Sequence, residues 1–113
     1  MGTNYYAVRT RPTCEEPIHI GKASAGWKFL FQTHYEIWHE PPIIWRRYED
    51  VIRWLKIYTV DNPKYVIVDE YDEIVSIHEF EKLVEMHQEA ENNEMFLDCR
   101  NVDGYRFSDR EFR

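Results

Sequence analysis

This chain of 113 residues is poor in cysteine and has no long apolar run. Its two cysteines, Cys14 and Cys99, cannot build the disulfide framework of a small secreted protein and suit a reducing compartment. No apolar stretch approaches the roughly 18 residues of a membrane-spanning helix, and no basic segment leads into an apolar one as in a secretory signal. We therefore expect a cytoplasmic protein that does not enter a membrane.

Aromatic residues, by contrast, are plentiful. They make up 16% of the chain, as four Trp, eight Tyr and six Phe. Each buried aromatic side chain removes a large apolar area from water, so a chain of this length can enclose a core of its own. The sequence contains no repeat, low-complexity tract or linker, and we expect a single α+β domain over residues 1–113.

The net charge of −7 is unevenly distributed along the chain. Residues 1–60 carry eight Lys or Arg against six Asp or Glu, whereas residues 61–103 carry three against thirteen. An acidic half of this kind repels nucleic acid and attracts basic surfaces. It is also typical of a solvated face that only keeps a protein soluble.

Patterns of apolar residues predict short strands and two helices. Alternating, aromatic and β-branched runs predict strands at 5–10, 18–20, 27–31, 65–69, 74–75, 95–99 and 105–107. A period near 3.6 residues predicts helices at 48–58 and from Ser76 to the polar run 91–93. This order indicates an α+β fold, with a small antiparallel sheet built from hairpins and two packed helices.

Three local signals place the ends of these elements. Ser76 and Glu79 have the spacing of a capping box, in which each side chain accepts a hydrogen bond from the other residue's amide. Asp103-Gly104 suits the tight turn of a hairpin. The small residues of 21–26 predict the turn of a second hairpin that spans 18–33.

Two sequence blocks near the start of the chain are more specific than the rest. The first is Gly-Thr-Asn-Tyr-Tyr at residues 2–6, and the second is His-Ile-Gly-Lys-Ala-Ser-Ala-Gly-Trp at residues 19–27. Together they resemble a widespread family of small phage-encoded proteins of unassigned function. Segments 67–80 and 103–107 are also similar to that family. The resemblance implies a phage protein that acts in the host bacterial cytoplasm, and it names no reaction.

The same resemblance raises the question of a zinc site. Relatives have two cysteines ahead of the histidine block, and thiolates and imidazoles are common zinc ligands. This chain keeps Cys14 but has Pro17 at the position of the second cysteine. One thiolate and three imidazoles remain as candidate ligands, at Cys14, His19, His34 and His39. The plainer interpretation leaves the protein without a cofactor, with Cys14 a small loop residue and His19 hydrogen-bonded or at the surface.

An acidic turn is followed by an acidic helix. The turn carries four carboxylates, at Asp69, Glu70, Asp72 and Glu73. The helix carries three more, one turn apart, at Glu81, Glu85 and Glu89. Such repeated like charges cost an isolated helix about 0.2–0.5 kcal/mol per pair, which is typical of a surface kept for function. The turn lacks the glycine and spacing of a calcium loop, and no neighbouring His or Lys completes a catalytic set, so we predict no enzymatic activity.

These acidic residues are predicted to bind a basic protein partner, and not nucleic acid or a membrane. Spaced carboxylates can imitate a phosphate backbone and occupy the basic groove of a nucleic-acid enzyme. With the phage resemblance, this predicts an anti-CRISPR-like inhibitor of a host defence nuclease, such as a CRISPR effector. The alternative is a small zinc- or ligand-binding phage accessory protein without enzymatic activity. A third interpretation is an aromatic-lined pocket that sequesters a nucleotide signal.

Overall fold

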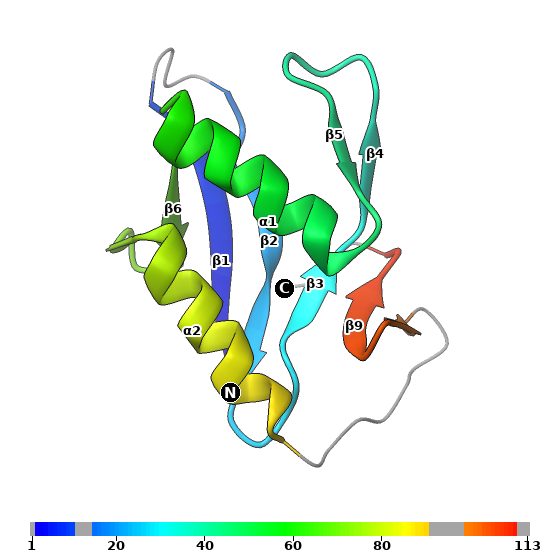
Figure 1. The fold of residues 1–113 in the computed structure, drawn as a ribbon. Helices are drawn as coiled ribbons and strands as arrows, with labels where there is room; N and C mark the ends of the chain where they lie inside the picture. Colours follow the sequence, from blue (N-terminus) through cyan, green and yellow to red (C-terminus); the bar gives the residue numbers. More distant parts are fainter. Residues whose placement is uncertain (1, 11–14, 91–98, 111–113) are drawn as a thin grey trace.

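The computed structural model describes residues 2–10, 15–90 and 99–110 (Figure 1). Their strands are β1 (Gly2–Arg9), β2 (Ile18–Ser24), β3 (Leu30–Gln32), β4 (His34–Glu36), β5 (Ile43–Trp45), β6 (Tyr65–Asp69), β7 (Ile74–Val75), β8 (Cys99–Val102) and β9 (Tyr105–Ser108). Their helices are α1 (Tyr48–Lys56), which continues into a π-helical turn η1 (Ile57–Asp61), and α2 (Ile77–Gln88). Seven strands form one sheet in the order β7-β6-β1-β2-β3-β9-β8, while β4 and β5 form a separate two-stranded sheet. Both helices cover the same face of the large sheet.

This arrangement confirms the predicted α+β class, with two helices packed on a sheet made largely of antiparallel pairs. The exception is β3, which runs parallel to β9 with Leu30 opposite Arg106. The sheet is therefore mixed. The β8–β9 hairpin is formed by residues close in sequence, as predicted. Its position beside β3 depends on contacts between residues far apart in sequence, such as the stacked rings of Phe31 and Phe107, whose centres lie 5.1 Å apart. No local sequence pattern signals such a contact.

The turn predicted at 21–26 is wrong for most of its length. β2 continues to Ser24, and its residue Gly21 pairs with β1 on one side and with β3 on the other. The chain reverses only at Ala25 and Gly26, where Gly26 has a φ of 81° and the Trp27 amide donates to the Ser24 carbonyl at 3.1 Å. Pairing with two neighbouring strands has outweighed the turn preference of these small residues.

The core lies between the large sheet and the two helices. Val51 and Leu55 of α1 and Phe80 and Val84 of α2 are fully buried, which explains the 3.6-residue apolar period of both segments. The strands contribute the fully buried side chains of Ala7, Ile20, Phe31, Ile67 and Phe107. Ile77, Leu83 and His87, which share the apolar period of α2, are half-buried.

The predicted capping box and hairpin turn are both confirmed. The Ser76 hydroxyl accepts the Glu79 amide at 3.1 Å, and the Glu79 carboxylate accepts the Ser76 amide at 3.3 Å. Asp103 and Gly104 both have positive φ, 53° and 88°, as a type I′ turn requires. Two further predictions lie outside the described residues: the end of the second helix at 91–93 and the first part of the next strand, at 95–98.

The hairpin of β4 and β5 was not predicted from the sequence. It projects beside the large sheet in Figure 1. Ile43 and Trp45 of β5 are fully buried. Ile44, between them, points to the other side of the hairpin, where it pairs with Tyr35 of β4; the two side chains are 42% and 59% exposed, respectively. The hairpin therefore has an inner face packed on the protein and an outer face that stays exposed.

Candidate functional site

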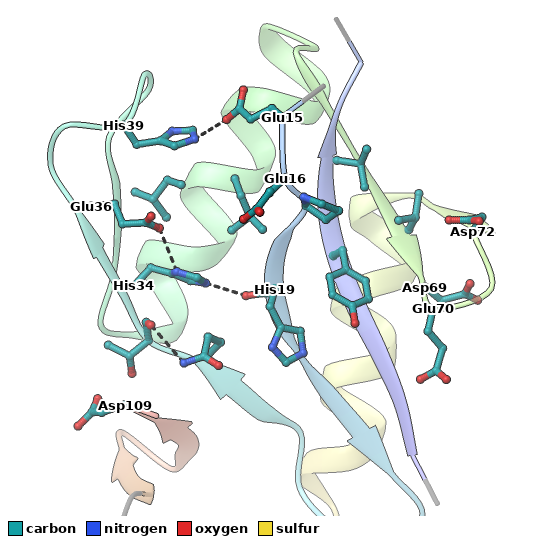
Figure 2. A pocket seen from close by; sticks show the side chains of 18 residues that line it. Glu15, Glu16, His19, His34, Glu36, His39, Asp69, Glu70, Asp72 and Asp109 are labelled. Carbon is teal, nitrogen blue, oxygen red and sulfur yellow. Dashed lines mark hydrogen bonds and ion pairs between the residues drawn. The ribbon is translucent and has the colours of Figure 1, made fainter. Parts of the chain in front are cut away.

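A groove of about 850 Å³ opens on the sheet face opposite the helices (Figure 2). Its acidic lining residues are Glu15, Glu16, Glu36, Asp69, Glu70, Asp72 and Asp109. Three histidines also line it, at His19, His34 and His39. The described lining contains no lysine and no arginine. We refer to this site as the acidic groove.

Three parts of the fold supply most of the acidic groove, and the loop before β2 and the residue after β9 add Glu15, Glu16 and Asp109. The β4–β5 hairpin carries Glu36 and, in its connecting loop, His39 on one side (Figure 2). β1 and β2 provide the centre, where the rings of Tyr6 and His19 lie 5.2 Å apart. The β6–β7 turn forms the other side (Figure 2). The site therefore depends on the tertiary arrangement, because its acidic residues come from segments far apart in the sequence.

The β6–β7 turn uses part of its negative charge to hold its own shape. The Asp69 carboxylate accepts the amides of Tyr71 at 2.8 Å and Glu73 at 3.0 Å, and Asp72 adopts a left-handed φ of 64°. The Glu70 carboxylate accepts the Asn4 amide of β1 at 2.7 Å, which fastens the turn to the sheet. Neutral amides leave the carboxylate charges in place, so the turn still presents negative charge to the groove.

A hydrogen-bonded cluster at the opposite end ties the hairpin loop to the sheet. The Glu15 carboxylate contacts the Nε2 atom of His39, lies 3.2 Å from the Arg9 guanidinium and accepts the Tyr65 hydroxyl at 3.2 Å. Burial raises the pKa of Tyr65; Arg9 opposes this rise and the Glu15 charge adds to it. The charge of Glu15 is thus balanced within the protein and contributes less to the groove than the exposed carboxylates do.

The structure brings the three predicted histidine ligands to the same groove but does not converge them on one point. His34 Nε2 lies 2.8 Å from the His19 carbonyl oxygen, and its Nδ1 lies 3.2 Å from the Glu36 carboxylate. His39 Nδ1 lies 2.7 Å from the Pro41 carbonyl oxygen. Within residues 2–10, 15–90 and 99–110, no three His, Cys, Asp or Glu side chains are grouped to hold a metal ion. The fourth predicted ligand, Cys14, lies outside the described residues, so the zinc site stays a prediction.

The predicted acidic surface is divided between two faces of the molecule. Asp69, Glu70 and Asp72 line the acidic groove, whereas Glu73 of the same turn does not. The glutamates of α2 also lie outside its lining, on the helix layer (Figure 1). There the Lys56 ammonium of α1 lies 3.6 Å from the Glu81 carboxylate. This ion pair between the helices partly compensates the repeated like charges of α2.

Tyr48, next to these glutamates, is expected to make the stability of the folded protein fall in alkali. Its ring stacks on that of Tyr105, with centroids 4.2 Å apart. Burial first, then the nearby Tyr105, Glu81 and Glu85, raise the pKa of Tyr48 well above its ordinary value of 10. Above pH 10 the unfolded chain releases this proton and the folded chain keeps it, so stability falls by up to about 1.4 kcal/mol per pH unit for each such group.

We therefore expect Tyr48→Phe to move the midpoint of alkaline unfolding to higher pH, measured by circular dichroism between pH 8 and 12. Phenylalanine keeps the stacked ring and removes the proton whose release favours unfolding. The matched control is Tyr71→Phe, at a side chain that is 71% exposed in the folded protein. An unchanged midpoint for Tyr48→Phe, or equal shifts for both variants, would contradict this account.

Sequence reasoning missed four of the seven groove carboxylates, namely Glu15, Glu16, Glu36 and Asp109. None of them belongs to a dense acidic run, and they lie in the loop before β2, at the end of β4 and after β9. Asp109 reaches the groove only because β9 pairs with β3. The adjacent Glu15 and Glu16 were the one available local signal.

No protein-family model matches this sequence, and no curated protein or solved structure gives a significant match to it. Among the described residues, neither helix is long and apolar enough to cross a membrane. The function must therefore be argued from the acidic groove and its surroundings.

Proposed function

We propose that this protein is a phage-encoded interaction protein that inhibits a host defence nuclease, in the manner of an anti-CRISPR protein. In this proposal the acidic groove occupies the basic surface on which the nuclease binds nucleic acid. The observation that supports it is the composition of the groove, which has seven carboxylates and no lysine or arginine among its described lining residues. The phage origin in this proposal rests on the resemblance of residues 2–6 and 19–27 to the family of small phage-encoded proteins.

Physical chemistry favours a basic protein as the occupant of the acidic groove. A concave surface lined by one sign of charge concentrates its field and speeds the approach of an opposite charge. Surfaces that bind nucleic acid are rich in Lys and Arg because they neutralise phosphates. A space of about 850 Å³ can receive several such side chains. Nucleic acid itself would be repelled by the same carboxylates.

The groove retains uncompensated charge after its internal contacts are considered. His34 lies next to Glu36, and Arg100 lies 3.1 Å from Asp109. Glu70 accepts hydrogen bonds only from the neutral groups of Asn4 among the contacts described here. Glu16 is exposed in the groove wall. Glu36, Glu70 and Asp72 are exposed in the groove lining as well, so the four carboxylates of Glu16, Glu36, Glu70 and Asp72 are available to an incoming cation.

The proposal is tested with purified, guide-loaded CRISPR effector nucleases, both single-subunit and multisubunit. Target-DNA cleavage and binding affinity are measured across a salt series. We expect inhibition of at least one effector, with an affinity that falls as salt rises. The double variant Glu16→Lys/Glu36→Lys should weaken binding at least about tenfold, which corresponds to about 1.4 kcal/mol.

The matched control is Glu85→Lys/Glu89→Lys, at a residue of α2 and at the residue that follows its C-terminal end, which changes the net charge by the same amount on the helix layer. It should leave the affinity within about twofold, because these residues lie outside the groove. Equal losses of affinity in both variants would show that binding depends on the net charge of the protein and not on the position of the carboxylates. A loss confined to the α2 variant would move the interface to that helix, and the absence of inhibition across the effectors would overturn the proposal.

A further inference from the structure

The loop that joins β4 to β5 presents large apolar side chains to solvent. Trp38 is 94% exposed and Ile37 is 45% exposed. They continue the exposed outer face of the hairpin, where Tyr35 lies opposite Ile44. Trp45, in the same hairpin, is fully buried, so exposure of Trp38 is not a general property of tryptophan here. An apolar cluster of this kind on a hairpin tip is typical of a contact surface.

The loop is also held in place, by two side chains from outside it and one of its own. Three consecutive carbonyl oxygens of the loop, those of Glu40, Pro41 and Pro42, each accept a side-chain hydrogen bond. The donors are Arg9 at 2.9 Å, His39 at 2.7 Å and Trp54 at 3.0 Å, respectively. A tip fixed before binding loses little conformational freedom on binding. The exposed tryptophan is therefore presented by a preorganised loop.

The charges around the tip indicate what kind of surface it fits. Residues 33–45 include two glutamates, Glu36 and Glu40, and no Lys or Arg. Glu36 also lines the acidic groove, so the tip and the groove adjoin on one side of the hairpin. The nearest cations described for the hairpin come from outside this range: the Arg46 guanidinium lies 4.7 Å from the centre of the Tyr35 ring, and the Arg9 guanidinium donates to the Glu40 carbonyl. A complementary partner surface combines an apolar pocket with a basic rim.

We infer that Trp38 is the anchor by which this protein docks on its basic partner, entering an apolar pocket next to the Lys and Arg residues that fill the acidic groove. This inference rests on the proposed function, since it assigns the same partner to both surfaces. The two surfaces have different roles. The groove contributes charge and salt dependence, and Trp38 contributes apolar burial that salt does not screen.

The test compares Trp38→Ala with Met86→Ala, the truncation of another exposed apolar residue, on α2 (63% exposed). The probe is the guide-loaded effector that the wild-type protein inhibits. We expect Trp38→Ala to weaken binding by about 30-fold or more, the loss typical of a hot-spot residue. The slope of affinity against salt should stay as in the wild type, and the melting temperature should move by no more than about 3 °C. Met86→Ala should change none of these quantities.

The outcomes separate this inference from the proposed function. If Glu16→Lys/Glu36→Lys weakens binding and Trp38→Ala does not, the anchor is wrong and the proposed function stands. If Trp38→Ala changes only sedimentation of the free protein, the apolar tip joins two copies of this chain and the inference is overturned. If no effector is bound by the wild type, the proposed function fails first, and the docking inference falls with it. A loss from Trp38→Ala together with an unchanged salt slope supports the anchor.

Discussion

Trp45→Ala is expected to lower the free energy of unfolding by about 3–5 kcal/mol, the cost typical of truncating a buried tryptophan. Trp45 is fully buried, with its ring centre 5.1 Å from that of His34 and 5.3 Å from that of Trp54. It attaches the β4–β5 hairpin to α1. Since small domains are stable by only about 5–15 kcal/mol, this loss is a large share of the total. Urea unfolding followed by fluorescence and circular dichroism measures it.

Two comparisons isolate the cause of that loss. Trp38→Ala removes the same atoms from an exposed position and should cost less than about 0.5 kcal/mol. Trp45→Phe keeps an aromatic ring and removes an indole N–H that is buried without a hydrogen-bond partner among the described residues. It should therefore recover most of the stability. A cost below about 1 kcal/mol for Trp45→Ala would mean that the hairpin does not pack as described.

Gly21→Val is expected to prevent normal packing of the sheet, with a cost of about 3 kcal/mol or more, at the upper end for overpacked sites. A Cβ atom added at Gly21 would lie 2.3 Å from the Leu30 carbonyl oxygen and 2.4 Å from the Phe29 ring. The first of these is a backbone atom of the adjoining strand and the second belongs to a fully buried side chain, so neither can yield easily. Thermal unfolding and the soluble yield of the variant test this expectation.

Gly104 provides the control, because it requires glycine for a different reason. It has a φ of 88° and no heavy atom within 4 Å of an added Cβ. Gly104→Ala should lower the free energy of unfolding by about 1–2 kcal/mol, because alanine is strained in a left-handed conformation. Gly104→Asn should lower it by less, since asparagine tolerates that conformation. Gly21→Asn should be as damaging as any other substitution at that site. If Asn were tolerated equally at both positions, steric contact would not be the reason for Gly21.

The elements that sequence predicts best are those fixed by neighbouring residues. The capping box of Ser76 and Glu79 and the turn at Asp103 and Gly104 each need only three or four residues, and both are confirmed. Gly21 shows the limit of such reasoning. Its smallness suggested a turn, but the space it leaves is taken by Phe29 from the adjoining segment. A sequence pattern shows that a residue is small without showing what lies against it.

The same limit explains the partial prediction of the candidate site. The density of carboxylates at 69–73 identified one wall of the acidic groove. The four-residue repeat of Glu81, Glu85 and Glu89 predicted a helix face, but periodicity does not specify what packs beside that face. Lys56 from the other helix lies there, and the groove opens on the opposite side of the sheet. The remaining wall depends on the unpredicted β4–β5 hairpin.

The parallel pairing of β3 with β9 also bears on the order in which the chain folds. The β8–β9 hairpin is local and can form within microseconds, whereas Leu30 must find Arg106 across 76 residues. The side-chain amide of Gln32 and the backbone amide of Thr33 then both donate to the Ser108 carbonyl, at 3.2 and 2.9 Å. We expect docking of this preformed hairpin to be a late step, limited by loop closure. Asp109 joins the groove wall only then, so a partly folded chain has an incomplete acidic groove and, under the proposed function, does not yet present the surface that a partner would recognise.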